Sequence, residues 1–193
     1  MTFERTSWPQ STERLTIRPL ETGDLPSTYP YRSDPDVARW LPRQPTSWKE
    51  YAVAMGKPEV LDLTLVVLLG EEIIGDLYLR VEDAWAQVEV AEVGKGAQAE
   101  LGWAFAPARH GHGYATEAVA ELVRICFEEL GVRRVTAIAF SENTPSLALM
   151  ERLGMRREAV YVEDSYHRDL GWLDSVGYAL LADEWRARRS TAG

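Results

Sequence analysis

Alternating apolar and polar residues, together with short apolar runs, predict a series of β-strands along this chain. The expected strands lie at residues 15–18, 63–69, 73–81, 100–105, 135–140, 156–163 and 172–181. Gly70-Glu71-Glu72 separates the second of these from the third and is typical of a tight turn, so the two are expected to pair as an antiparallel hairpin. Residues 82–96 are expected to be irregular and to form either a wide connection or an extension of the hairpin.

Apolar residues three and four positions apart predict helices between the strands. The longest is expected at residues 114–130, and Gly131 should end it. Its apolar stripe consists of Ala115, Ala118, Val119, Leu122, Ile125 and Cys126. Shorter helices are expected at three start signals, which are Asp34-Pro35, the capping-box pair Ser47 and Glu50, and Thr144-Pro145.

The order of these elements predicts the fold class. A strand, short helices and the hairpin come first, and a strand–helix–strand–helix–strand–strand series follows. The strand–helix–strand part at residues 100–140 should form a right-handed parallel unit. We therefore expect an α/β, or α+β, domain with a mixed, mostly antiparallel sheet, a central parallel strand pair and helices on both faces. A loosely ordered segment is expected at residues 1–12, a single domain at 13–185 and a tail at 186–193.

Composition narrows the classes of function. The chain has 193 residues and 46% of them are hydrophobic, so one compact domain can bury a sizeable core. A net charge of −9 opposes binding to nucleic acids and anionic membranes, and it favours approach of a cationic substrate. The single cysteine, Cys126, excludes an internal disulfide and fits a reducing compartment. The sequence has no apolar run of membrane-spanning length and no signal peptide at its start, so a cytoplasmic protein is expected.

The segment that carries chemistry is residues 107–117, between a predicted strand and the longest helix. Gly111 and Gly113 let the backbone turn tightly there and approach a ligand closely. Because the first N–H groups of a helix lack helical partners and the helix dipole favours an anion, the segment predicts a pyrophosphate cradle. A plain strand-to-helix turn is the alternative. A P-loop would need Gly-Lys-Ser/Thr, and a dinucleotide loop would need a third glycine near residue 116 or 117, so coenzyme A is the remaining candidate.

This segment resembles the acetyl-CoA loop of the GNAT superfamily of N-acetyltransferases, whose pattern is Arg/Gln-x-x-Gly-x-Gly/Ala. The resemblance is carried by His110, Gly111, His112, Gly113, Tyr114 and Ala115. The next residues, Thr116-Glu117-Ala118, are similar to the RimJ/RimL-like branch, which acetylates protein N-termini and other amines. Further similar segments occur in family order at residues 14–20, 99–103, 141–146 and 151–155.

The resemblance implies a GNAT-like fold, acetyl-CoA as co-substrate, no metal, and an amine acceptor that is a protein N-terminus or a cationic small molecule. Homodimers are common in this branch, so a homodimer is an assembly that it also implies. CoA contacts are expected from Trp103, Phe105, His110, Gly111, His112, Gly113, Tyr114, Ala115 and Asn143. Among these, the backbone of Trp103 and Phe105 should pair with the pantetheine amides, while their side chains join the core. Asn143 should hydrogen-bond either the pantetheine or the protein's own turn.

His110 stands where the family usually has Arg or Gln, and we expect main-chain N–H groups to bind the pyrophosphate in spite of it. His110 and His112 also offer poor geometry for a metal, since they lie two residues apart in a glycine loop and no third ligand is evident.

Acetyl transfer requires one group to remove a proton from the amine and another to protonate the departing thiolate. Glu100 is the candidate base or water-holding group, because on a strand it shares a face with Gly102 and Ala104, which leave room for a substrate. A structural hydrogen bond or ion pair is the alternative for Glu100. Some RimL-like enzymes use a serine three residues after the asparagine, so the resemblance implies Ser146 as the candidate acid. An ordinary serine of a helix first turn is the alternative.

The sequence also departs from the family at Met150, where many members have a tyrosine that protonates the thiolate. Methionine cannot donate a proton. The departure favours a second function, a catalytically inactive acyl-CoA-binding or sensor module, which the retained Glu100 and Ser146 oppose. Polar residues at 161–169 either line an acceptor site or form a polar loop. The first hypothesis remains transfer of an acetyl group from acetyl-CoA to a primary amine by direct attack on the thioester.

Overall fold

The computed structural model describes residues 3–191, and the chain divides into two compact units. The first contains the chain up to Arg80 together with Gly102–Ile125, and the second contains Val81–Leu101 and the chain from Cys126 onward. Hydrogen bonds connect the strands of the described residues in the order β1-β2-β3-β4-β5-β6-β8-β7. The pair β5–β6 is parallel, whereas β1–β2, β2–β3, β3–β4, β6–β8 and β7–β8 are antiparallel. The predicted mixed, mostly antiparallel sheet with one parallel pair is therefore confirmed.

Antiparallel strands form the sheet of the first unit. They are β1 (Gln10–Ser11), β2 (Thr16–Pro19), β3 (Thr64–Leu69) and β4 (Glu72–Glu82). β3 and β4 form the predicted hairpin, and Gly70 turns the chain between them with a φ of 62°. Leu65 and Val66, whose side chains lie on opposite faces of β3, are both 0% exposed. Burial on both faces explains why the sequence of β3 is a continuous apolar run.

The helices of the first unit are α1 (Leu25–Arg32), α2 (Pro35–Ala38), α3 (Trp48–Met55), α4 (Pro58–Leu61) and α6 (Tyr114–Arg124). The predicted start of α2 is confirmed, since the Asp34 carboxylate accepts a hydrogen bond from the N–H of Asp36 at 2.9 Å. The capping box of α3 is confirmed only in part. The Ser47 hydroxyl accepts from the N–H of Glu50 at 3.3 Å, but the Glu50 carboxylate accepts from Thr46 instead of from the N-cap backbone.

α1 was not predicted, because its sequence contains Pro26 and Pro30. Pro26 lies in the first turn, where its missing N–H costs no helical hydrogen bond, and Pro30 lies within the last turn. Tertiary contacts hold the helix in place. The Tyr31 hydroxyl and the Arg32 Nε each donate to Asp76 Oδ2 of β4 at 2.7 Å, and the Asp76 side chain is buried. Burial and the adjacent Asp76 charge raise the pKa of Tyr31 well above its ordinary value.

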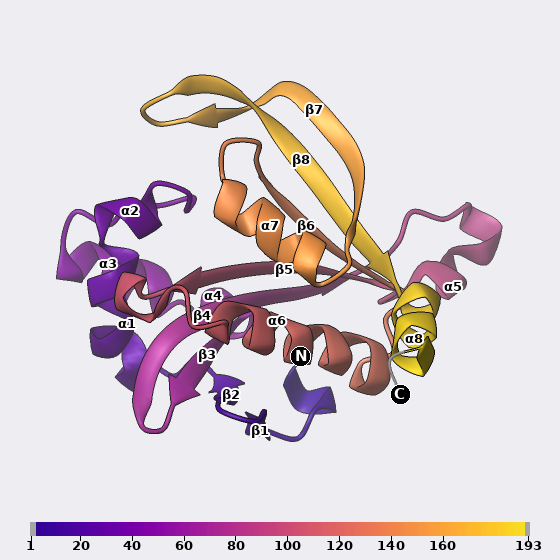
Figure 1. The fold of residues 1–193 in the computed structure, drawn as a ribbon, viewed down its shortest axis with the longest axis horizontal. Helices are drawn as coiled ribbons and strands as arrows, with labels where there is room; N and C mark the ends of the chain where they lie inside the picture. Colours follow the sequence, from indigo (N-terminus) through magenta and orange to yellow (C-terminus); the bar gives the residue numbers. More distant parts are fainter. Residues whose placement is uncertain (1–2, 192–193) are drawn as a thin grey trace. The chain divides into compact units, whose positions relative to one another are not determined.

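The second unit contains the parallel pair and a long hairpin. Its strands are the first half of β5 (Gln98–Phe105), β6 (Arg134–Phe140), β7 (Arg156–His167) and β8 (Gly171–Leu181). Its helices are α5 (Ala91–Gly94), within the connection expected to be irregular, α7 (Thr144–Arg152) and α8 (Ala182–Thr191). Figure 1 shows β7 and β8 as a long, curved hairpin in orange and yellow. The segment expected as a tail from residue 186 continues α8 as far as Thr191.

The helix predicted at residues 114–130 has two parts. It is α-helical at Tyr114–Arg124 and continues as a π-helix at Ile125–Glu129. Gly131 then adopts a φ of 72°, as expected for a residue that ends a helix. The predicted stripe is buried with the exception of Ala115, which is partly exposed.

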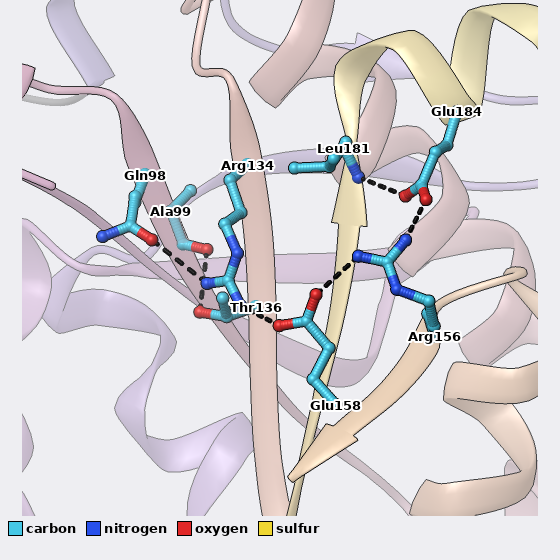
Figure 2. Close-up of polar contacts among 8 residues, drawn as sticks. All are labelled: Gln98, Ala99, Arg134, Thr136, Arg156, Glu158, Leu181 and Glu184. Carbon is cyan, nitrogen blue, oxygen red and sulfur yellow. Dashed lines mark hydrogen bonds and ion pairs between the residues drawn. The ribbon is translucent and has the colours of Figure 1, made fainter.

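Charged side chains tie the C-terminal elements of the second unit to one another, as Figure 2 shows. Glu158 of β7 accepts hydrogen bonds from Arg156 and from Arg134 of β6, although β8 lies between β6 and β7. Arg156 also pairs with Glu184 of α8, and Arg134 donates to Gln98 of β5 at 3.1 Å. Burial alone would raise the pKa of Glu158, but the two arginines outweigh it and lower that pKa. This network of charged side chains therefore connects the ends of β5, β6 and β7 with the start of α8.

Candidate functional site

The connection from β5 to α6, within the first unit, contains the predicted phosphate loop. The N–H of Ala106 donates to Ile74 O of β4 at 2.9 Å, which fixes the point where the chain leaves the sheet. A 3₁₀ turn, Pro107–Arg109, follows, and α6 begins after Gly113. Residues 110–113 are exposed. The loop therefore presents its backbone to solvent at the start of a helix of 11 residues.

Gly111 and Gly113 both have left-handed backbone conformations, with φ values of 78° and 81°. A side chain at Gly111 would meet nothing within 4 Å, so conformation and not crowding requires glycine there. Gly113 is the N-cap of α6 and makes no side-chain cap hydrogen bond within the described residues. The tight turn predicted from the two glycines is therefore confirmed, and the N-cap residue of α6 has no side chain that could cap the helix.

Three side-chain contacts hold this loop. Arg109 pairs with Glu72 of β4, the Nε2 of His110 lies 3.0 Å from the carbonyl oxygen of Phe105, and Arg14 donates to the carbonyl oxygen of His112 at 3.1 Å. Because a carbonyl oxygen only accepts, Nε2 of His110 must carry the hydrogen. The imidazole is thus turned back to the end of β5. It occupies one lone pair of the carbonyl that was expected to pair with pantetheine.

The C-terminal half of β5 agrees with the sequence only in part. Phe105 is buried, as expected, but Trp103 is only partly buried. The room expected beside Gly102 is reduced, because a Cβ at Gly102 would lie 3.4 Å from the Cβ of Tyr78 on β4. Tyr78, which the sequence patterns did not single out, is therefore the side chain that borders this stretch of β5 within the first unit.

Glu100 lies on the first half of β5, in the second unit. It is opposite Thr136 in the parallel pair with β6, while its neighbours Ala99 and Leu101 are buried on the other face. The alternation predicted for this strand is therefore confirmed at Glu100. Its carboxylate is partly exposed and, among residues 3–191, makes neither a hydrogen bond nor an ion pair. The structural role considered for Glu100 thus finds no partner in the described part of the chain.

Asn143 and Ser146 lie at the start of α7, also in the second unit. Asn143 is the N-cap, and its side-chain oxygen accepts a hydrogen bond from the N–H of Ser146 at 3.4 Å. Asn143 was expected to hydrogen-bond either the pantetheine or the protein's own turn, and the structure shows the bond to the turn. Ser146 is partly buried at the third helical position, and Met150, one turn later, is 0% exposed. The residue in the family's tyrosine position therefore belongs to the buried core.

The polar segment at residues 161–169 is in part structural. The His167 side chain is 2% exposed, and its Nδ1 accepts hydrogen bonds from the N–H groups of Asp169 at 3.1 Å and Leu170 at 3.3 Å. This side chain therefore closes the turn of the β7–β8 hairpin. Tyr166 is exposed and its ring packs edge-on against Trp172, with centroids 5.2 Å apart.

Three further features bear on the possible functions of the chain: its cysteine, groups that could hold a metal ion, and helices that could cross a membrane. Cys126 is fully buried, and burial raises the pKa of its thiol, in keeping with the expected core role. Within residues 3–191, no group of three or more His, Cys, Asp and Glu side chains is arranged to hold a metal ion. No helix in the same part of the chain has the length and apolar character needed to cross a membrane.

Comparison with known proteins identifies relatives along most of the chain. The family profile described as acetyltransferase (GNAT) domain matches residues 14–156. The uncharacterized N-acetyltransferase YnaD of Bacillus subtilis is 30% identical over 178 residues, which cover 91% of this chain and 98% of that protein. The uncharacterized N-acetyltransferase p20 of Bacillus licheniformis is 29% identical over 185 residues, or 90% of this chain and 96% of the relative.

Solved structures give the same result. An acetyltransferase of the GNAT family from Bacillus anthracis has a TM-score of 0.76 and 28% identity, and the match covers 90% of this chain and 98% of the other. Mycobacterium smegmatis RimJ in complex with CoA-disulfide has a TM-score of 0.74 and 24% identity, covering 96% of this chain and 95% of RimJ. At that identity the likeness to RimJ is a likeness of fold.

Proposed function

Because the chain belongs to the GNAT family of acetyltransferases, we propose that it transfers an acetyl group from acetyl-CoA to a primary amine by direct attack on the thioester. The observation that carries the proposal is the loop before α6. It presents two left-handed glycines and a helix N-terminus without a side-chain cap. Such an end binds a phosphate group through main-chain N–H groups and the helix dipole.

In the proposed complex, the pyrophosphate of acetyl-CoA binds the backbone at residues 110–115. Gly111 and Gly113 permit close approach, and the N–H groups of Tyr114 and Ala115 donate from the first turn of α6. The braces at Arg109, His110 and His112 support this role, since a loop that is already ordered loses less entropy when it binds. No metal takes part in the proposed chemistry.

The acceptor amine is protonated at neutral pH, so the reaction begins with removal of a proton. Glu100 takes this proton directly or through a water, and its unpaired carboxylate supports that role. The amine nitrogen then attacks the thioester carbonyl carbon and forms a tetrahedral intermediate. As the C–S bond breaks, the electron pair leaves on sulfur and Ser146 donates a proton to the thiolate. The attacking nitrogen loses its second proton, which returns to the Ser146 oxygen directly or through water. The Ser146 side chain is partly exposed on the first turn of α7.

The proposed acceptor is a protein N-terminus or a cationic small molecule. Two observations support it: the net charge of −9, and the likeness of fold to RimJ and to a ribosomal-protein-S5-alanine acetyltransferase from Vibrio fischeri. The second of these has 16% identity and a TM-score of 0.72. The likeness of fold also supports a place for the chain in the RimJ/RimL-like branch. We further propose that the protein is cytoplasmic and that it forms a homodimer, which remains to be tested.

One observation favours a second function, an inactive module that only binds acyl-CoA. Met150 is fully buried and cannot protonate a thiolate, so a module with this residue could bind without turnover. Calorimetric titration with acetyl-CoA, followed by thiol release measured with a panel of amines, separates the functions. The panel should include a peptide with a free N-terminus, the same peptide acetylated, and a polyamine. Binding with amine-dependent thiol release supports the enzyme, binding without release supports the module, and absence of binding contradicts both.

A further inference from the structure

A polar clamp connects the N-terminal segment of the chain to the first turn of α6. Glu117, in that first turn, accepts hydrogen bonds at Oε1 from the Thr12 hydroxyl at 2.5 Å and from the Arg14 backbone N–H at 3.0 Å. Its Oε2 accepts from Arg14 Nε at 2.7 Å, and Nη2 of Arg14 lies 2.6 Å from the same oxygen. The two parts of this clamp are 103 to 105 residues apart in sequence. All of its atoms belong to the first unit.

The clamp reaches the phosphate loop through Arg14. Nη1 of Arg14 donates to the carbonyl oxygen of His112 at 3.1 Å, and the guanidinium carbon lies 4.7 Å from the centre of the Tyr114 ring. The guanidinium thus contacts the residue before Gly113 and the residue after it. A Cβ built on Gly113 would lie 3.5 Å from Arg14 Nη2.

The contact between Arg14 and the His112 carbonyl also determines the direction in which the N–H of Gly113 points, because the two groups belong to one peptide. In a trans peptide the C=O of one residue and the N–H of the next point in opposite directions. Because the His112 carbonyl is directed at Arg14, the N–H of Gly113 must be directed away from Arg14. Release of that carbonyl would let the peptide rotate more freely, since φ of Gly113, one of the two torsions that turn this peptide, has few steric limits.

Charge and burial keep the clamp closed at neutral pH. The side chain of Glu117 is 17% exposed and that of Arg14 is 42% exposed. Burial alone would raise the pKa of Glu117, but hydrogen bonds from Thr12 and Arg14 and the Arg14 charge outweigh it and lower that pKa. The carboxylate is therefore ionised and neutralises Arg14, which leaves the guanidinium to hold the loop and not to act as a free cation.

We propose that the clamp of Thr12, Arg14 and Glu117 sets the affinity for the pyrophosphate of acetyl-CoA by fixing the orientation of the His112–Gly113 peptide. Arg14 is a positioning residue, and the phosphate contacts are made by backbone N–H groups. The clamp has this role only if acetyl-CoA is the ligand, as proposed above. Arg14 belongs to the segment at residues 14–20 that resembles the family, but the sequence does not connect it with the phosphate loop, because its partner is a residue of α6.

The test compares CoA affinity by calorimetry in four proteins: the parent chain, Arg14→Ala, Glu117→Gln and Arg14→Lys. Arg14→Ala should raise Kd roughly tenfold to a hundredfold, the scale of one or two hydrogen bonds that involve a charged group. Glu117→Gln should have a smaller effect in the same direction, since it retains the side-chain shape but not the charge. Arg14→Lys should recover only part of the affinity, because an ammonium cannot reproduce the fork that joins Glu117 and His112.

Arg124→Ala is the matched control. Arg124 also pairs with a glutamate of α6, Glu121, at 2.7 Å, but it lies at the opposite end of that helix from the loop. It should lower the melting temperature without raising Kd by more than about threefold, which is within the scale of a surface pair. If Arg124→Ala weakens CoA binding as much as Arg14→Ala, a general loss of stability explains both and the clamp proposal is wrong.

Kinetics supply an independent measurement once an acceptor has been identified. Arg14→Ala should raise the KM for acetyl-CoA and leave kcat and the KM for the amine nearly unchanged, because the pyrophosphate is remote from the reacting bond. The outcomes also separate this inference from the proposed function. A parent chain that binds no CoA overturns the proposed function, whereas a parent that binds CoA with an Arg14→Ala variant that binds equally well overturns the clamp alone.

Discussion

Two helices of this chain, α6 and α7, each follow a strand, yet only one of them has an N-terminus that is capped by a side chain. α6 begins at Gly113, which makes no side-chain cap in the described structure, whereas α7 begins at Asn143, whose side chain accepts the N–H of Ser146. α7 also has Pro145 in its first turn, a residue without an N–H. One helix end is closed by its own side chain. The other begins at a glycine, which has no side chain to cap it.

The two helix ends also differ in what holds the preceding loop. At α7 the Asn143 side chain and backbone both bond to residues of the helix they precede. At α6 the loop is held from outside, by Glu72 of β4 and by Arg14 of the N-terminal segment. A helix end that caps itself can be built from a few adjacent residues. The loop before α6, where no side chain caps the helix, is held instead by residues that are distant in sequence.

The largest effect is expected where the open end of α6 is blocked. Gly113→Asp adds a negative charge and a side chain that is strained at a φ of 81°, so CoA affinity should fall by roughly a hundredfold or more. Calorimetry measures this loss. Gly70→Asp, at a φ of 62° in the exposed turn of the β3–β4 hairpin, is the control for strain and charge. Normal CoA binding by Gly113→Asp would mean that the loop is only a turn.

The second-largest effect is expected at Ser146, which lies in the first turn of α7. Ser146→Ala should lower kcat roughly tenfold to a hundredfold while the Kd for acetyl-CoA stays constant, since only the transition state uses its proton. Steady-state kinetics with a responsive amine check this. Met150→Tyr is not expected to restore the rate, because Met150 is 0% exposed and a larger ring would overpack the core. Unchanged kcat in Ser146→Ala would assign the proton to water.

Much of this contrast could be predicted from sequence. Local signals are sufficient for the glycine loop, the β3–β4 hairpin and the start of α7, because the residues that form each feature are adjacent in the chain. The signals fail where distant contacts decide. α1 contains two prolines and is held by a buried carboxylate on β4, and the loop before α6 is braced by residues from β4 and the N-terminal segment.

The candidate catalytic residues show the same limit. The alternation predicted at residues 100–105 correctly put Phe105 in the core, and Ala99 and Leu101, the neighbours of the partly exposed Glu100, are buried. It could not show that the Tyr78 side chain lies against Gly102, since that contact comes from a neighbouring strand. Asn143 was expected to bond pantetheine or its own turn, and only the packed helix start shows that the turn bond forms.

A smaller effect should separate the two roles of Asn143. Asn143→Ala removes the cap of α7 and should lower the free energy of unfolding by about 1 kcal/mol, as loss of an N-cap usually does. Asn143→Asp retains an acceptor at the same helix end and should restore this stability. Urea denaturation measures both variants. The Kd for CoA should change by less than about threefold in Asn143→Ala, within the small change expected when no ligand contact is lost, and a tenfold rise would show that Asn143 also binds the cofactor.

The smallest effect is a pH dependence at the open end of α6. Hydrogen bonds and the Arg14 charge lower the pKa of Glu117 below its ordinary value of 4.5, although burial acts against them. A lowered pKa in the folded state means that ionised Glu117 stabilises the protein above pH 4.5, and that this stability is lost as the pH falls through the lowered pKa. Because the Arg14 side chain is 42% exposed, solvent screens the pair, and about 0.5 to 1 kcal/mol is expected. The free energy of unfolding of the parent should therefore exceed that of Glu117→Gln at pH 7, and the difference should shrink below pH 4.5.

Glu13→Gln, at an exposed position next to Arg14 in the sequence, should show no such difference at either pH. A gap between the parent and Glu117→Gln that stays constant down to pH 3 would show that the shape of the Glu117 side chain, and not its charge, braces the open end of α6.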